Sequence, residues 1–279
     1  MSFGGRVDSG RVSSLRRNLS LSIIVPTYKE CGNLKALADR TFAAFGAEPQ
    51  EERPSFVEMI IVDDNSRDGS LELVESTISK EHPTVRIIVR TTERGLSSAV
   101  LRGFDEAKGD ILLCMDADLQ HPPESVPSMY KPYLTYGSSV VFVLGKREIP
   151  ETSQWSIARR IISRGATLLA YPLTAGIMTD PMTGFFAVRA TAYRTYKSRI
   201  DGVGYKIALE ICVKCEAASA NTKEVTFAFG ERSVGESKLT GKVILHYLKH
   251  LRGLYMHVYL RKIIVAIIFL TVVAIYYTR

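Results

Sequence analysis

Residues 115–123 read MDADLQHPP, and they follow directly on an apolar run at 111–115. A short apolar run that ends in polar residues is typical of a buried strand in a parallel sheet. Side chains alternate along a strand, so an extended continuation would aim Asp116, Asp118 and Gln120 to one side. Two carboxylates held that close repel each other unless a cation lies between them. The stretch therefore predicts a cation site at the end of a strand.

The first half of the chain repeats this strand pattern. Short apolar runs alternate with helical segments, which predicts an α/β domain with a mostly parallel, Rossmann-like sheet flanked by helices. The expected strands lie at 21–28, within 57–70, and at 85–90, 110–120 and 139–147, and the expected helices at 33–46, 70–80 and 96–107. The first strand is followed by PTYKECGN, without GxGxxG, and no Walker A sequence follows any strand. These absences exclude the phosphate loops of dehydrogenases and P-loop enzymes.

Composition limits the classes of protein that need to be considered. The 279 residues allow one large α/β domain with an appendage, or two small domains. The net charge of +7 fits an anionic substrate, a membrane surface or a solvated basic face. No RNA-binding signature occurs, so nucleic acid is not an expected partner. The CxxC of Cys212 and Cys215 lacks a second ligand pair, so we interpret both as helix residues rather than zinc ligands.

The two ends of the chain differ in character. Residues 1–18 are rich in Gly, Ser and Arg, which predicts a disordered basic arm, with a mitochondrial transit peptide as the alternative. Residues 239–262 have the pattern of a basic amphipathic helix on anionic lipid. The fifteen uncharged residues at 263–277 would cover ~23 Å as a helix, against a hydrocarbon core of ~30 Å. Basic flanks and terminal tyrosines favour a membrane anchor over a buried or an interfacial helix.

Acidic residues follow three of the expected strands. Glu30 comes after the first strand, Asp64 after the second, and Asp116 and Asp118 after the fourth. The carboxyl ends of parallel strands meet at one edge of a sheet, so these side chains should share one site. Carboxylate oxygens suit Mg²⁺ or Mn²⁺, and Mg²⁺ usually binds carboxylates together with substrate phosphates. The pattern predicts a site for a nucleoside diphosphate and a divalent metal.

The motifs at these strand ends resemble a known family. IIVPTYKE, IIVDDNSRDGS, RGLSSAVLRGFDEAKGD and MDADLQHPP are similar to the family 2 inverting glycosyltransferases, which have a GT-A fold and a DXD-type metal site. RRIISRGA, DPMTGFFAVR, GYKIALEI and ERSVGESKL resemble, more closely, the dolichol-phosphate mannose synthases. The resemblance covers roughly residues 20–260. It implies transfer of mannose from GDP-mannose to dolichyl phosphate with inversion, by a single-chain enzyme that needs no protein subunit.

Carried over to matching positions, the resemblance assigns three sets of residues. It implies contacts with GDP-mannose or dolichyl phosphate for Pro26, Tyr28, Glu30, Val62, Asp64, Asp116, Ala117, Asp118, Arg147, Arg159, Lys206, Arg232 and Lys238. It implies Mg²⁺ or Mn²⁺ at Asp116, Asp118 and Gln120, and catalytic roles for Asp118, Arg232 and Lys238. The second-strand motif departs from the family pattern at Arg67, where a proline is common.

The chemistry of the implied reaction agrees with the residues. A phosphate oxygen is already anionic at neutral pH, so no general base is required, and we expect none of the five histidines to be catalytic. The rivals are a transferase that uses UDP-glucose, a non-catalytic nucleotide-sugar-binding protein, and a processive polysaccharide synthase. The last usually carries a QxxRW motif, whereas here Gln154 and Trp155 are adjacent.

We expect a catalytic domain at 19–238, an interface helix at 239–262 and a membrane anchor at 263–277. The basic residues that precede the anchor, among them Arg261 and Lys262, predict that the catalytic domain faces the cytosol. A short span suits the thin bilayer of the endoplasmic reticulum. The lipid bilayer is thus an expected partner.

Overall fold

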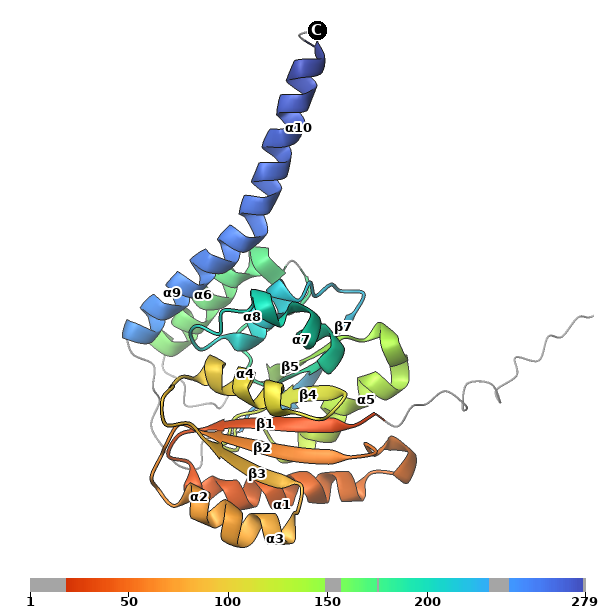
Figure 1. Ribbon diagram of the computed structural model, residues 1–279, viewed down its shortest axis with the longest axis vertical. Coiled ribbons are helices and arrows are strands. Elements are labelled where there is room, and N and C mark those ends of the chain that lie inside the picture. Colours follow the sequence, from red (N-terminus) through yellow and green to blue (C-terminus); the bar gives the residue numbers. More distant parts are fainter. Residues whose placement is uncertain (1–18, 149–156, 175, 231–240, 278–279) are drawn as a thin grey trace, which may run out of the picture.

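The computed structural model describes residues 19–148, 157–174, 176–230 and 241–277. A seven-stranded sheet forms its centre, in the order β3-β2-β1-β4-β6-β5-β7 (Figure 1). Strand β6 pairs antiparallel with β4 and β5, and the other neighbours pair in parallel. The strands are β1 (Leu21–Thr27), β2 (Val57–Asp63), β3 (Val85–Val89), β4 (Ile111–Cys114), β5 (Phe142–Glu148), β6 (Phe186–Arg189) and β7 (Thr222–Ala228). The expected α/β architecture with a mostly parallel sheet is confirmed.

Helices cover both faces of the sheet. The longer helices are α1 (Cys31–Ala47), α4 (Leu96–Glu106), α5 (Val126–Tyr136), α6 (Ile157–Thr174), α7 (Ala190–Tyr196), α8 (Ile207–Lys214), α9 (Gly241–Tyr255) and α10 (Arg261–Tyr277). Short segments are α2 (Ser70–Leu73), α3 (Ser79–Glu81), the π-helical η3 (Val74–Ile78) and η7 (Met256–Leu260), and the 3₁₀ turns η2 (Gln50–Glu52), η4 (Pro123–Ser125), η5 (Gly137–Ser139) and η6 (Lys197–Arg199).

The core has two layers, one on each face of the sheet. Every residue of β1 is buried, and successive side chains of a strand point to opposite faces of the sheet. Ile23 packs with α1 and α5 on one face of the sheet. Ile24 packs on the other face with residues of α4, α6, α8 and α9. Burial on both faces explains why the strands read as continuous apolar runs.

Strand β4 ends sooner than the sequence predicted. The expected strand at 110–120 stops at Cys114, and the chain then turns, with Leu119 in the left-handed region at φ 63°. The extended continuation of this strand was therefore wrong. A turn, and not the alternation of a strand, places Asp116 and Asp118 at the end of β4.

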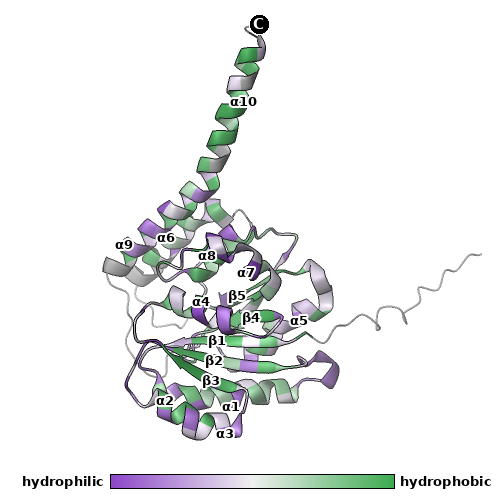
Figure 2. Cartoon of the chain, viewed as in Figure 1, coloured by the Kyte–Doolittle hydropathy of each residue, from purple (hydrophilic) through white to green (hydrophobic). Residues whose placement is uncertain are grey.

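The C-terminal segments form one helical run. The segments expected as an interface helix (239–262) and an anchor (263–277) are continuous where the structure describes them, because α9, η7 and α10 follow one another without a break. Within the described residues, one helix, Ile244–Tyr276, is long and apolar enough to cross a membrane, and none of its most apolar window is buried. The first part of this helix packs on the catalytic domain, and the 17 residues of α10 that extend beyond it cover about 26 Å. Figure 2 shows most of α10 in the green of hydrophobic residues.

A buried network of charges joins α8 to α9. The fully buried Glu210 accepts a hydrogen bond from Lys214 Nζ at 2.8 Å and one from the backbone N–H of Asp201 at 2.7 Å. Lys214 Nζ also contacts Asp201 Oδ2 at 2.6 Å, and His250 Nε2 of α9 lies 3.5 Å from Glu210 Oε2. Burial alone would raise the pKa of Glu210, but the approach of His250 and the bonds from Lys214 and Asp201 outweigh it and hold the pKa below its ordinary value.

We expect Glu210→Gln to lower the free energy of unfolding by about 3 kcal/mol, because it leaves the buried Lys214 ammonium without its inner partner. The matched control is Glu216→Gln, whose exposed ion pair with Arg199 should contribute below about 1 kcal/mol. Denaturant unfolding of the full chain in detergent measures both. Equal losses in the two variants would contradict the prediction.

This network also sets a pH dependence. The folded-state pKa of Glu210 lies below the ordinary value of 4.5 for a glutamate, so its stabilisation is complete above that value and is lost as pH falls through the folded pKa. The stability difference between parent and Glu210→Gln should be constant from neutral pH down to about 5 and shrink below that.

Candidate active site

A cleft of about 870 Å³ opens at the carboxyl ends of the parallel strands. Its floor comes from the strand ends, and two of its walls come from α6 and α9. Of the residues predicted for the site, it is lined by Pro26, Tyr28, Glu30, Asp64, Asp116, Ala117, Asp118, Arg147 and Lys206. The acids that strand-end reasoning assigned to one site, Glu30, Asp64, Asp116 and Asp118, thus do line one cleft.

Of the other predicted residues, Val62 and Gln120 do not line this cleft, and the side chains of Arg159, Arg232 and Lys238 are not described. Val62 is fully buried in the core on the face of α4, so its side chain lies beneath the site. Arg159 lies in α6, but its side chain is not described. Arg232 and Lys238 fall outside the described residues, so their roles stay predictions.

The turn after β4 presents two carboxylates. Asp116 is partly exposed, whereas Asp118 is buried and accepts the backbone N–H of Gln120 at 3.1 Å. Gln120 is not among the cleft-lining residues. Its Nε2 donates to the carbonyl of Gly230 at 3.2 Å, which ties the turn to the chain after β7. The two carboxylates supply oxygen atoms that fit a hard divalent cation.

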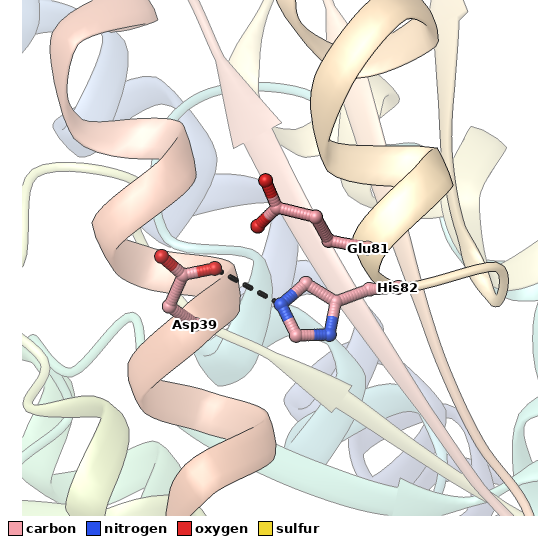
Figure 3. Close-up of side chains that lie close together, drawn as sticks. All are labelled: Asp39, Glu81 and His82. Carbon is pink, nitrogen blue, oxygen red and sulfur yellow. Dashed lines mark hydrogen bonds and ion pairs between the residues drawn. The ribbon is translucent and has the colours of Figure 1, made fainter.

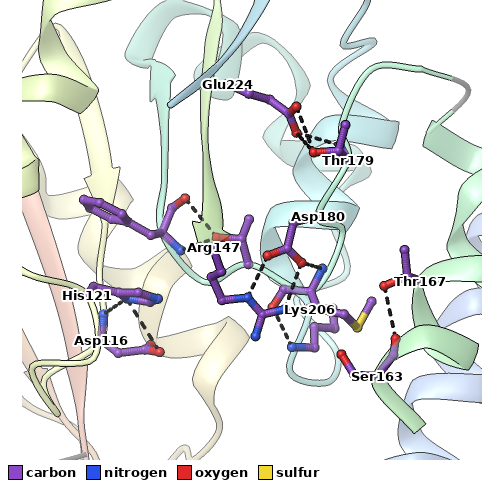
Figure 4. Close-up of polar contacts among 12 residues, drawn as sticks. Asp116, His121, Arg147, Ser163, Thr167, Thr179, Asp180, Lys206 and Glu224 are labelled. Carbon is purple, nitrogen blue, oxygen red and sulfur yellow. Dashed lines mark hydrogen bonds and ion pairs between the residues drawn. The ribbon is translucent and has the colours of Figure 1, made fainter. Parts of the chain in front are cut away.

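His121 holds this turn from behind (Figure 4). Its Nδ1 accepts the backbone N–H of Asp116 at 2.9 Å, and its ring stacks on Phe185 at 5.2 Å between centroids. Burial lowers the pKa of His121, although the nearby Asp116 acts in the opposite direction. A neutral imidazole is also what the hydrogen bond requires, because Nδ1 must accept. His121 therefore shapes the carboxylate turn and does not contact the cleft.

A cationic wall faces the carboxylates. Arg147 of β5 makes two parallel bonds to Asp180, at 2.6 and 2.8 Å (Figure 4). Burial would raise the pKa of Asp180, but the bonds from Arg147 more than offset it and hold the pKa below its ordinary value. Lys206 donates to the carbonyl of Met182 at 2.9 Å. Burial lowers the pKa of Lys206 to about 8, and Arg147 acts in the same direction.

The opposite end of the cleft carries an aromatic ring and a buried ion pair. The guanidinium of Arg94 lies 5.6 Å from the centre of the Tyr28 ring. Asp64 accepts bonds from Arg90 and from the backbone N–H of Gly95, the latter at 2.8 Å. The ion pair fixes the Asp64 carboxylate at the end of β2. Tyr28 and Arg94 together offer a face on which a planar base can stack.

Sequence reasoning missed Asp180, His121, Arg90 and Arg94. Asp180 precedes β6 and not the end of a parallel strand, so the strand-end rule did not reach it. Arg90 and Arg94 follow β3, where the sequence offers no carboxylate pair to mark a site. The signal for Asp180 was its place in the quoted DPMTGFFAVR stretch.

A second group of possible metal ligands lies on the surface between α1 and α3. Asp39, Glu81 and His82 bring one ligand atom each within 4.8 Å of one another (Figure 3). Lys35 Nζ contacts Asp39 at 2.9 Å and Glu81 at 2.5 Å, so a positive charge already balances both carboxylates. This group is an ion-pair network rather than a second metal site.

Comparison with known proteins adds the following findings. A model of the family Glycosyl transferase family 2 matches residues 22–197. Dolichol-phosphate mannosyltransferase of Mycosarcoma maydis is 49% identical over 239 residues, which cover 85% of this chain and 79% of that protein. Dolichol-phosphate mannosyltransferase of Saccharomyces cerevisiae is 46% identical over 245 residues, which cover 85% of this chain and 88% of that protein.

A solved structure shares the fold. Glucosyl-3-phosphoglycerate synthase from Mycobacterium tuberculosis, in complex with Mn²⁺, uridine diphosphate and glucosyl-3-phosphoglycerate, superposes with a TM-score of 0.61. The alignment covers 92% of this chain and 86% of that chain, at 15% sequence identity. At that identity the likeness shows the fold alone.

Proposed function

The chain belongs to glycosyl transferase family 2 and has its GT-A fold, and on that premise we propose that it transfers mannose from GDP-mannose to dolichyl phosphate. One observation carries the proposal beyond the likeness to its relatives. A single cleft joins the carboxylate turn at Asp116 and Asp118 to an apolar slot between α6 and α9. A nucleotide sugar and a lipid phosphate can therefore meet in it.

The polar end of the cleft binds the donor in this proposal. The base stacks at Tyr28, while Glu30 and Asp64 accept hydrogen bonds from base or ribose. Pro26 and Ala117 line the space between them. Asp116 and Asp118 would hold Mg²⁺ or Mn²⁺, with Gln120 as the predicted third ligand. When bound, the metal neutralises charge on the leaving diphosphate.

The reaction is a single displacement. A phosphate oxygen of the acceptor attacks the anomeric carbon of mannose, and the bond from that carbon to the diphosphate oxygen of GDP breaks with inversion. No proton has to leave the nucleophile, so the neutral, buried His121 is not needed as a base. Arg147 and Lys206 offset the repulsion between the phosphates of donor and acceptor. Arg159, Arg232 and Lys238 are proposed to act with them.

The apolar end of the cleft takes the lipid. Ile162 and Leu169 of α6 face this end together with Ile244 and Leu248 of α9. The same helical run continues into α10, which is long and apolar enough to cross a bilayer. A polyprenyl chain can therefore leave the cleft between these helices without contact with water.

The full chain in detergent, given labelled GDP-mannose and dolichyl phosphate, tests the activity. We expect labelled lipid whose anomeric configuration is inverted relative to the donor. The rival donor is UDP-glucose, because the base contacts alone separate guanine from uracil. Product from UDP-glucose but none from GDP-mannose would favour the rival. No lipid product from either donor would contradict the proposed reaction.

The carboxylate turn supplies the next prediction. Asp118→Asn should lower the rate about 10²- to 10³-fold, since it weakens charge stabilisation at the leaving group. A chelator such as EDTA should inactivate the parent, and added Mn²⁺ or Mg²⁺ should restore it. The matched control is Asp105→Asn, an exposed carboxylate of α4 that pairs with Lys197. Full turnover of Asp118→Asn, or of the parent in excess chelator, would contradict the metal assignment.

Lys206 predicts a pH dependence of donor binding. Its pKa of about 8 means that the ammonium is charged below this pH and neutral above it. GDP affinity should fall as pH rises from 7 to 9, by about tenfold if one charge-assisted contact is lost. The control is Lys206→Arg, because arginine stays charged over this pH range. Any change in GDP affinity that remains in this variant therefore comes from the titration of other groups, including GDP itself. Parallel profiles for parent and variant, measured by calorimetry, would show that Lys206 does not contact the ligand.

We propose that α10 anchors the chain in the membrane of the endoplasmic reticulum, with the catalytic domain in the cytosol and no further subunit. The proposed orientation is supported by four basic residues that precede the most apolar part of the helix, because the positive-inside rule favours the cytosol for that side: Lys249, Arg252, Arg261 and Lys262. Deletion of 263–279 should release the chain from carbonate-washed membranes. A glycosylation acceptor added after Arg279 should be modified in cells. Full retention of the truncated chain, or an acceptor that is never modified, would contradict the span.

A further inference from the structure

Three tyrosine hydroxyls join the C-terminal helical run to the backbone of α6. Tyr247 donates to the carbonyl of Ala166 at 2.7 Å. Tyr255 donates to the carbonyl of Leu169 at 2.8 Å, and Tyr259 to that of Pro172 at 3.2 Å. We call these three residues the tyrosine ladder.

The acceptors of the ladder are spaced three residues apart on α6, so they follow one face of that helix. Helix α6 ends at Thr174, and Pro172 lies in its last turn, where the backbone carbonyls have no donor within the helix. Tyr259 supplies a donor to one of these orphan carbonyls. A hydroxyl on an apolar surface in turn needs a partner, and the carbonyl provides it. The bonds therefore satisfy polar groups on both helices.

The π-helical segment η7 brings the upper tyrosines into line. In an α-helix, residues four apart are offset by roughly 40° around the axis. The π-helical turn of η7 (Met256–Leu260) follows directly on Tyr255 and has more residues per turn than an α-helix, which reduces that offset. The rings of Tyr255 and Tyr259 stack at 5.7 Å, and both reach α6. Figure 1 shows α9 alongside α6 and α10 rising from it at a steeper angle.

The ladder stands at the apolar end of the cleft. Tyr247, Ala166 and Leu169 all line it, so two of the three bonds have a member in the cleft wall. Leu251 and Leu254 of α9 are buried against the core, which fixes the other side of that helix. The ladder joins α6 to the C-terminal helical run on the open side of that run.

We propose that Tyr247, Tyr255 and Tyr259 are positioning residues for the lipid acceptor: their hydroxyls hold α9 against α6 and thereby fix the width of the slot that takes the polyprenyl chain. The inference rests on the proposed function, because it assigns the acceptor to this slot. Without the hydroxyls the two walls separate, the chain is held less closely, and the donor end is unaffected.

The test replaces each tyrosine by phenylalanine, singly and together, in the full chain. Phenylalanine keeps the ring and removes only the hydroxyl. The matched control on the same helical run is Tyr276→Phe, at a residue that is 78% exposed. We expect the triple variant to raise KM for dolichyl phosphate about tenfold or more, with kcat and KM for GDP-mannose within twofold of the parent. A short-chain acceptor should lose less than a long one.

A second measurement does not depend on turnover. Hydrogen exchange of the α6 amides from Ala166 to Thr174 should be faster in the triple variant than in the parent, and unchanged in Tyr276→Phe. Provided that the parent is active, three results for the triple variant would overturn the ladder without bearing on the proposed activity. These are an unchanged KM for the acceptor, unchanged hydrogen exchange, or equal losses for donor and acceptor. A parent that forms no lipid product from GDP-mannose would instead overturn the proposed function and, with it, the acceptor assignment.

Discussion

Repulsion between negative charges is the constraint on which the rest of the site depends. Asp116 and Asp118 lie on one turn, and Glu30 and Asp64 line the same cleft. Any phosphate that enters adds to this charge. The structure meets the constraint with cations held by buried partners, not with mobile surface lysines. Arg147 is held in place by Asp180, and Lys206 by a backbone carbonyl.

The location of the site could be predicted from the sequence, but much of its detail could not. Apolar runs that end in acids are a local pattern, and parallel pairing necessarily gathers their ends, so Glu30, Asp64 and Asp116 were placed correctly. The local conformation after β4 was not, because the left-handed turn at Leu119 leaves no mark on a strand-like pattern. Asp180 lies 33 positions from its partner Arg147, and only the fold brings the two together.

The lipid end of the cleft could not be predicted from the sequence either. The sequence predicted a helix over α9, but not that it forms a wall of the cleft with α6, because that depends on packing between distant segments. The continuity of α9, η7 and α10 follows from the residues at their junction. Neither glycine nor proline stands at 261–263 to end a helix, so amphipathic and apolar parts continue as one element.

The reversed direction of β6 has a topological consequence. A strand that runs against its neighbours delivers its leading loop, not its trailing one, to the edge where the parallel strands end. Asp180 and Met182 stand in that leading loop. The four-residue pairing of Ile111–Cys114 with Phe186–Arg189 thus sets the distance between the carboxylate turn and the cationic wall. A slip of two residues in this register would keep every side chain on its own face of the sheet, yet would move one wall of the cleft by about 7 Å relative to the other.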